Sequence, residues 1–188
     1  MDNRLSGMKI AILATDGFEQ SELMKPREAL KGAGAQTVVV SPHDGEVRGW
    51  NKKDWGDSVP VDMILSRANP AEFDALLLPG GVINPDHLRM DPNAVAFVKA
   101  FFEADKPVAA ICHGPWTVID AGFAKGRRMT SWPSLKTDLT NAGANWVDEE
   151  SVTDGNLVTA RKPDDIPAFN TAMLTLFGEK GAQAKMAM

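Results

Sequence analysis

Cysteine is almost absent from this chain of 188 residues, in which Cys112 is the only one. A single thiol excludes an internal disulfide, so nothing in the sequence points to an oxidising compartment, and we expect a cytoplasmic protein. One cysteine and three scattered histidines leave no ligand spacing typical of a metal site, so we expect no metal. Walker A and dinucleotide-binding glycine motifs are also missing, which argues against a bound nucleotide and predicts no cofactor.

Long apolar runs and clusters of positive charge are missing as well. No uninterrupted apolar stretch approaches the roughly 20 residues that a membrane-spanning helix needs, and the N-terminal sequence MDNRLSG lacks the apolar core of a signal peptide. The 20 lysines and arginines are dispersed among 25 acidic residues, with a net charge of -5, so no face of the chain is suited to phosphates. We therefore expect neither a membrane nor a direct nucleic-acid partner.

What the sequence does contain is an alternation of short apolar runs with helical patterns. With 44% hydrophobic residues, the chain is long enough for one buried core, and the repeated order strand, helix, strand predicts an α/β fold with a mostly parallel sheet covered on both faces. We predict one domain over residues 1–188, with its core at about 8–178 and a flexible tail at about 179–188. The predicted strands lie at 8–14, 35–42, 75–79, 106–112, 127–132 and within 145–160, and the predicted helices at 19–34, 91–105, 115–126, 134–143 and 164–181.

Residues 43–62 interrupt this rhythm with glycines, charges and short β-prone pieces. We predict a hairpin or an irregular insertion there. Its two tryptophans, Trp50 and Trp55, either cap the core or form a subunit contact.

Cys112 stands at the end of an apolar run and directly before His113 and Gly114. One hypothesis is an inert core residue, because free cysteine is among the most buried residue types. The other is a nucleophile on a sharp turn between strand and helix, where a glycine two positions later allows the turn. Pro115 and a predicted helix follow, which favours the second hypothesis: a helix N-terminus favours the thiolate, and the backbone N–H of His113 lies where an oxyanion would form.

Two further motifs follow strands whose carboxyl ends share an edge of the sheet with Cys112. Gly80 and Gly81 either form a plain loop or place the N–H of Gly81 as a second oxyanion donor. Glu19 and Glu22, three residues apart at the opening of a helix, either stabilise the helix dipole or send one carboxyl group to Cys112. A charged carboxylate would repel a thiolate, so we expect such a glutamate to be protonated and to donate a hydrogen bond.

A proton carrier is the remaining requirement of this hypothesis. His113 is the candidate acid and base because the ordinary pKa of histidine is near neutrality, and it needs a carboxylate to orient it. Asp86, in the sequence NPDH, is the nearest candidate by motif. His87 and His43 are expected at the surface.

Several separated motifs together resemble a known family: AICHGP, LLLPGG, FEQSEL, NPAEFDAL and TSWPSLKTDLTNAGANWVDEESVTDGNLVTAR. They are similar to the PfpI-type intracellular protease and general stress protein family of the ThiJ/PfpI superfamily, which is related to class I glutamine amidotransferase domains. The resemblance runs from Met8 to about Gly178. It implies a flavodoxin-like three-layer sandwich, α/β in class, and a homodimer or higher homo-oligomer.

The resemblance also implies roles for individual residues. Cys112 corresponds to the reactive nucleophile, Glu22 to the glutamate that contacts it, and Glu19 to its companion. His113 corresponds to a histidine that pairs with an acidic residue of a neighbouring subunit, here Asp86, whose side chain is one methylene shorter than the usual glutamate. Ala110 stands where the amidotransferases have glycine, and Trp116 is expected to narrow the pocket.

The function implied by the resemblance is that of a stress-response cysteine hydrolase, a PfpI-like peptidase or a deglycase or glyoxalase-like enzyme. Its substrate would be a small molecule, a peptide or a glycated protein. Two alternatives stay open: a redox sensor in which Cys112 is oxidised instead of turning over, and a chaperone that needs no cysteine.

Overall fold

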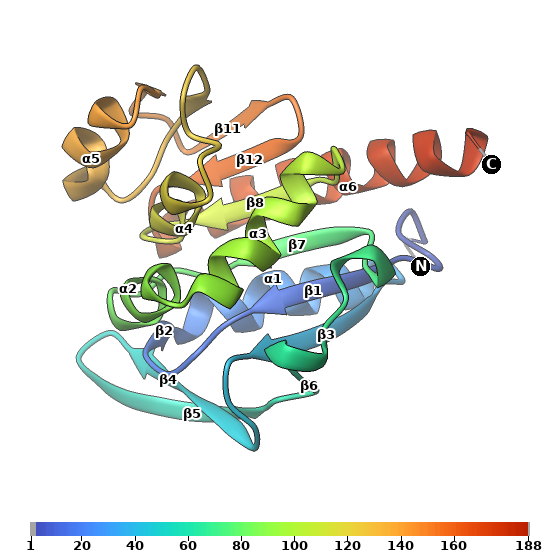
Figure 1. The fold of residues 1–188 in the computed structure, drawn as a ribbon, viewed down its shortest axis with the longest axis horizontal. Helices are drawn as coiled ribbons and strands as arrows, with labels where there is room; N and C mark the ends of the chain where they lie inside the picture. Colours follow the sequence, from blue (N-terminus) through green and yellow to red (C-terminus); the bar gives the residue numbers. More distant parts are fainter. Residues whose placement is uncertain (1–2, 188) are drawn as a thin grey trace.

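The short apolar runs of the sequence form the central strands of a three-layer fold, seen in a computed structural model that describes residues 3–187 (Figure 1). The strands are β1 (Lys9–Leu13), β2 (Phe18–Glu19), β3 (Gln36–Ser41), β4 (Glu46–Asn51), β5 (Asp54–Pro60), β6 (Met63–Ile64), β7 (Ala75–Leu78), β8 (Val108–Ile111), β9 (Arg128–Met129), β10 (Asn145–Trp146), β11 (Ser151–Asp154) and β12 (Leu157–Ala160). The helices are α1 (Gln20–Gly32), α2 (Ile83–Met90), α3 (Pro92–Glu103), α4 (Pro115–Asp120), α5 (Lys136–Asn141) and α6 (Ile166–Met186), with 3-10 turns at Leu65–Arg67, Pro70–Glu72, Pro133–Leu135 and Pro163–Asp165.

The main sheet has seven strands in the order β11-β12-β8-β7-β1-β3-β6. All neighbours in it are parallel except β11, which runs antiparallel to β12. The predicted α/β class with a mostly parallel central sheet is confirmed. Because the parallel strands end at one edge, the loops after β1, β7 and β8 lie close together there.

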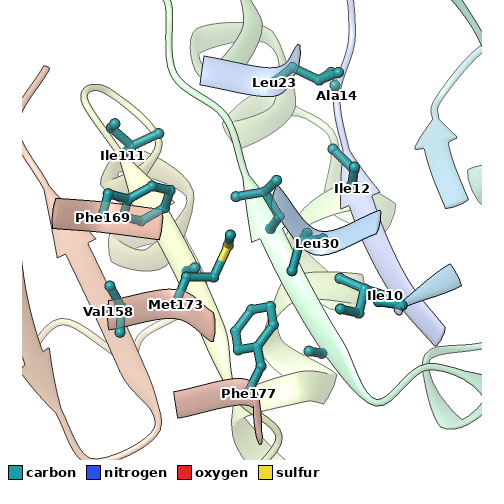
Figure 2. Packing of buried hydrophobic residues seen from close by; sticks show 14 of the residues in the cluster. Ile10, Ile12, Ala14, Leu23, Leu30, Ile111, Val158, Phe169, Met173 and Phe177 are labelled. Carbon is teal, nitrogen blue, oxygen red and sulfur yellow. The ribbon is translucent and has the colours of Figure 1, made fainter. Parts of the chain in front are cut away.

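Two hydrophobic clusters cover the two faces of the sheet, since successive strand side chains point to opposite sides. Ile10 and Ile12 of β1 face α1 and α6, where they pack in one cluster with Leu30, Met173 and Phe177 (Figure 2). The alternate side chains of β1 join α3 and α4 in the second cluster. The sheet is therefore buried on both faces, which explains why its strands are continuous apolar runs.

Residues 43–62 contain the predicted hairpin, formed by the antiparallel strands β4 and β5. Trp50 and Trp55 pair across it edge to face, with ring centroids 5.5 Å apart. Trp55 is 41% exposed and neither ring belongs to a core cluster, so the two tryptophans pack on each other instead of capping the core. A subunit contact at this hairpin stays a prediction.

Two segments differ from the sequence-based expectation. Residues 83–90 form helix α2, a stretch for which the sequence predicted neither a helix nor a strand. Helix α6 continues to Met186, so most of the expected tail at 179–188 is helical, and Lys185 donates a hydrogen bond to the carbonyl of Ser6. Residue 188 lies outside the described residues, and the domain limits stay a prediction. Within residues 3–187, no helix combines the length and apolar character that a bilayer crossing requires.

Candidate active site

Cys112 lies on a sharp turn between β8 and α4. Its φ of 63° places a residue other than glycine in the left-handed region, a strained conformation that the surrounding hydrogen bonds maintain. The Cys112 N–H donates to the carbonyl of Ala160, and the Cys112 carbonyl accepts from Trp132. A Cβ atom on Gly114 would come within 2.7 Å of the Leu78 carbonyl, so this position requires glycine. The thiol side chain is only 5% exposed.

The glycine pair after β7 lies directly against this turn. A Cβ atom on Gly80 would stand 2.6 Å from both the Cys112 Cβ and the Glu22 Oε1. Gly81 has a φ of 80°, and a Cβ atom there would overlap with the Gly17 carbonyl. The N–H groups of Gly81 and His113 both interact with the Cys112 thiol and act to lower its pKa. The structure thus brings together the two predicted oxyanion donors.

Glu22 projects from the first turn of α1 into the same place and is fully buried. Burial, with the nearby charge of Glu19 adding to it, raises the pKa of Glu22 from 4.5 to about 8, so the carboxyl group is protonated at neutral pH. Neither carboxyl oxygen meets full hydrogen-bond geometry with any group in the described part of the chain. The Cys112 thiol and the amides of Gly80 and Gly81 are nevertheless close enough to offset part of the rise in pKa.

Glu19 precedes α1 and is half-buried. Its N–H donates to the Gly80 carbonyl at 3.3 Å, and its carboxylate accepts from the Ser21 hydroxyl. Glu19 therefore connects the start of α1 to the glycine loop, and its charge adds to the effect of burial on the pKa of Glu22.

The His113 side chain contacts its neighbour directly, with Nδ1 3.1 Å from the Cys112 Sγ. The imidazole ring lies between two tryptophans. Trp116 meets it edge to face, with ring centroids 5.0 Å apart, and Trp132 stacks on it, with ring centroids 5.9 Å apart. Burial lowers the pKa of His113 from 6.5 to about 4, so the imidazole is neutral at pH 7. Among residues 3–187, the structure shows no hydrogen-bond partner for its Nε2.

The electrostatics of the thiol differ from the sequence-based expectation of a favoured thiolate. Burial raises the pKa of Cys112 well above its ordinary value, and a charge on Glu22 raises it further. The two amides act in the opposite direction without overcoming burial in the single chain. Ionisation of Glu22 opposes ionisation of Cys112, because one negative charge at this site disfavours a second.

The remaining predicted residues lie outside this cluster. Asp86 is exposed on α2, and no hydrogen bond or ion pair joins it to His113 within residues 3–187. His87 is exposed as expected. His43 is only partly buried and lies 3.3 Å from the hydroxyl of Thr15. No group of three or more metal-binding side chains comes together in the residues that the structure describes.

Two residues near the site were not predicted from the sequence. Trp132 follows Cys112 by twenty positions, and only the fold stacks its ring on His113. Asn84 is buried beneath the glycine loop. An asparagine between two apolar or turn-forming residues was the sole sequence signal for it.

Chemically, the cluster combines a thiol, a carboxyl group that retains its proton, a neutral imidazole and two backbone N–H groups at the edge of a parallel sheet.

Residues 8–176 match the sequence model of the DJ-1/PfpI family. The chain belongs to this family.

Members of the DJ-1/PfpI family resemble the chain over nearly its whole length. Protein/nucleic acid deglycase 2 of Escherichia coli is 45% identical over 172 residues, which cover 90% of this chain and 98% of the relative. General stress protein 18 of Bacillus subtilis is 46% identical over 172 residues, with the same coverage. The crystal structure of Drosophila melanogaster DJ-1beta has a TM-score of 0.82 at 26% identity and covers 96% of each chain. The resemblance predicted from the sequence motifs is confirmed.

Proposed function

We propose that this protein is a stress-response, cysteine-dependent hydrolase of the deglycase type, with Cys112 as its nucleophile. The observation that carries the proposal is the convergence on the Cys112 thiol of the His113 ring at 3.1 Å and of the N–H groups of Gly81 and His113. The names of its relatives, a deglycase and a general stress protein, support the same function.

The arrangement supports attack on a carbonyl carbon. In an acyl substrate, the carbonyl oxygen takes the electron pair as the bond between sulfur and carbon forms, and it accepts hydrogen bonds from Gly81 and His113. The neutral His113 Nδ1 accepts the thiol proton and delivers it to the leaving nitrogen, so the bond from carbon to nitrogen breaks without releasing an unprotonated amine. In a dicarbonyl adduct, sulfur replaces nitrogen on the carbon that also carries a hydrogen and a hydroxyl group. A proton then moves from this carbon to the neighbouring carbonyl carbon, whose oxygen holds the negative charge on the way, and a thioester of the hydroxy acid results. Water cleaves the thioester formed in either case and restores the thiol. Glu22 keeps its proton at neutral pH. Once the thiol has ionised, this proton is available for a hydrogen bond to the sulfur, which would stabilise the thiolate.

The exposure of the site favours small adducts over long peptides. Cys112 is 5% exposed and His113 is 7% exposed, and the rings of Trp116 and Trp132 contact His113 on two sides. A dicarbonyl adduct at the end of a lysine or arginine side chain is a small electrophile that needs little room around the thiol. A peptide bond needs more room, because polypeptide chain continues on both sides of it. We therefore favour glycated side chains and related small molecules as the substrate class.

Turnover of a defined adduct tests this function. The protein is incubated with the methylglyoxal adduct of Nα-acetyl-lysine, and the release of amine and hydroxy acid is followed, with an unmodified peptide substrate alongside. A parallel reaction with free methylglyoxal separates cleavage of the adduct from removal of the dicarbonyl that dissociates from it. We expect many products per thiol in the wild type and none above background with Cys112→Ser. Full activity of the serine variant would exclude the mechanism, and a single modification per thiol would indicate the redox sensor instead.

We also infer that the protein acts in the cytoplasm as a homodimer or higher homo-oligomer. Supporting this, the His113 Nε2 has no carboxylate partner within residues 3–187, and Asp86 is exposed and free to meet a second copy. A carboxylate next to His113 would raise its pKa and make it a stronger base. Light scattering should give a mass of at least two chains, and Asp86→Asn should slow turnover while His87→Asn does not. A monomer with full activity would contradict the inference.

A further inference from the structure

Asn84 is a buried polar residue that none of the steps above uses. It is the second residue of α2 and is 0% exposed. Its Oδ1 accepts a hydrogen bond from the Thr15 N–H at 2.8 Å, while its Nδ2 donates to the carbonyls of Pro79 at 3.1 Å and Gly80 at 3.2 Å. Since the Thr15 N–H only donates and the two carbonyls only accept, these partners define which end of the amide is oxygen. The side chain therefore links the loop after β1 to the loop after β7.

The bond to Gly80 determines the direction of the next N–H group. In a planar trans peptide, the carbonyl of one residue and the N–H of the following residue point in opposite directions. The Gly80 carbonyl is held on one side by Asn84 and by the Glu19 N–H at 3.3 Å. The N–H of Gly81 consequently points to the other side, where it interacts with Cys112 and Glu22.

A peptide between two glycines can reverse its direction easily, because neither residue has a Cβ atom to oppose the rotation. Reversal would turn the Gly80 carbonyl toward Cys112 and its lone pairs toward the developing negative charge. Both glycines are nevertheless required here, since a Cβ atom on either would collide with neighbouring groups. The loop therefore needs an external group to fix its orientation, and a fully buried amide with three hydrogen bonds supplies one.

We propose that Asn84 is the positioning residue of the oxyanion site: by holding the Gly80 carbonyl, it directs the N–H of Gly81 at the oxygen of the reacting carbonyl group. This inference rests on the proposed function of Cys112 as a nucleophile toward carbonyl carbon. Asn84 itself touches neither substrate nor thiol, and its effect is transmitted through a single peptide unit.

Two reagents that differ in their need for an oxyanion donor test this role. 4-Nitrophenyl acetate acylates Cys112 by addition to a carbonyl: the bond between sulfur and carbon forms, the ester oxygen leaves as 4-nitrophenolate, and an oxyanion develops on the way. Iodoacetamide alkylates the same sulfur by displacing iodide at a saturated carbon, where no oxyanion forms. Both rates are measured up to their pH-independent limits, so that a change in the thiol pKa does not enter the comparison.

For Asn84→Ala, we expect the limiting acylation rate to fall by at least about 10-fold, and complete loss of the oxyanion donor would lower it by roughly 100-fold. The variant should lower kcat and leave KM almost unchanged. The limiting alkylation rate should stay within about 3-fold of the wild type, since a displaced oxyanion donor does not affect that reaction. Equal losses in both reactions would mean a general structural role, and unchanged acylation would overturn the inference directly.

Asn156→Ala is the matched control. Asn156 is 4% exposed, and its Nδ2 donates to the Lys106 carbonyl at 3.0 Å, at the opposite edge of the sheet. Its loss should lower stability by a similar amount while both reaction rates stay at the wild-type level. If Asn84→Ala does not fold, Asn84→Asp keeps the size of the side chain and the acceptor for Thr15 but removes the amide donors.

The crystal structure of the folded variant gives a result that does not depend on activity. The Gly80–Gly81 peptide should be reversed or present in two orientations, and a single wild-type orientation would overturn the inference. If the wild type is not acylated at Cys112, the proposed function fails, and this structural result alone still decides whether Asn84 orients the loop. If the wild type and the variant are acylated equally, the function stands and the inference fails.

Discussion

Replacement of Glu22 by glutamine should change the pH dependence of stability in a defined window. Glutamine has the size of glutamate and cannot ionise, so the variant isolates the cost of burying this carboxyl group. The pKa of Glu22 is raised by burial from 4.5 to about 8. In the unfolded chain the carboxyl group loses its proton above about pH 4.5, whereas in the folded chain it keeps the proton until about pH 8.

The sign and the size of the effect follow from this difference. Between the two pKa values the unfolded state binds fewer protons than the folded state, so the free energy of unfolding decreases as the pH rises. At about 1.4 kcal/mol per pKa unit, a shift from 4.5 to about 8 corresponds to a loss of roughly 5 kcal/mol across the window. The contribution of Glu22 to stability is fully present below pH 4.5 and is lost as the pH approaches 8.

Urea unfolding of a matched pair of variants measures this loss. Cys112→Ser and Cys112→Ser/Glu22→Gln share every other titrating group, and the serine removes ionisation of the thiol. The difference between their free energies of unfolding should change by about 1.4 kcal/mol per pH unit within the window, to the disadvantage of the glutamate. A difference that stays constant between pH 4.5 and 8 would refute the argument, because Glu22 would then titrate alike in both states.

Three further outcomes are expected. Gly80→Ala should cost about 1–3 kcal/mol of stability and alter alkylation of Cys112, because the added Cβ would lie 2.6 Å from the Cys112 Cβ. The control Gly32→Ala should stabilise the protein by about 0.5–1 kcal/mol, because Gly32 is helical and has open space around it. Equal stabilities of the two variants in thermal unfolding would contradict this prediction. Alkylation by iodoacetamide across pH gives the apparent pKa of Cys112. This pKa should be about one to two units higher in Glu22→Leu than in Glu22→Gln, because only glutamine donates a hydrogen bond to the thiolate. Identical pKa values in the two variants would exclude that hydrogen bond. Trp132→Ala should accelerate labelling by N-ethylmaleimide more than labelling by iodoacetamide, since it removes the ring stacked on His113, and an unchanged ratio of rates would show that the ring does not restrict access.

The parallel sheet could be predicted from the sequence because strands buried on both faces are continuous apolar runs, such as VAAI in β8. Helix α2 could not, because it begins after two glycines and contains Pro85 at its third position. Proline is tolerated there because the first N–H groups of a helix have no partner within it. The helical continuation of α6 was missed because its contacts are with the N-terminal segment, far away in sequence.

For the site, the sequence located the groups that follow strands, since the ends of parallel strands share one edge. Cys112, Gly81 and Glu22 are close together for that reason. The direction of the thiol pKa was not predictable, because it depends on how deeply the folded chain buries the sulfur. Asn84 was equally hidden, because its importance comes from three partners, two of them in the loop after β7 and one in the loop after β1.

Two features of the cluster destabilise the fold, and both make sense only in terms of chemistry. Cys112 adopts a left-handed conformation that costs about 1–3 kcal/mol for a residue with a Cβ atom. Glu22 is buried without a hydrogen bond of good geometry inside residues 3–187, although a leucine would fill similar space at no electrostatic cost. Strain at the nucleophile points its sulfur at two N–H groups, and burial keeps a proton on the carboxyl group beside it. The Glu22→Leu variant should therefore be at least as stable as the wild type near pH 8 and yet impaired in turnover, which separates the chemical role of this residue from its structural one.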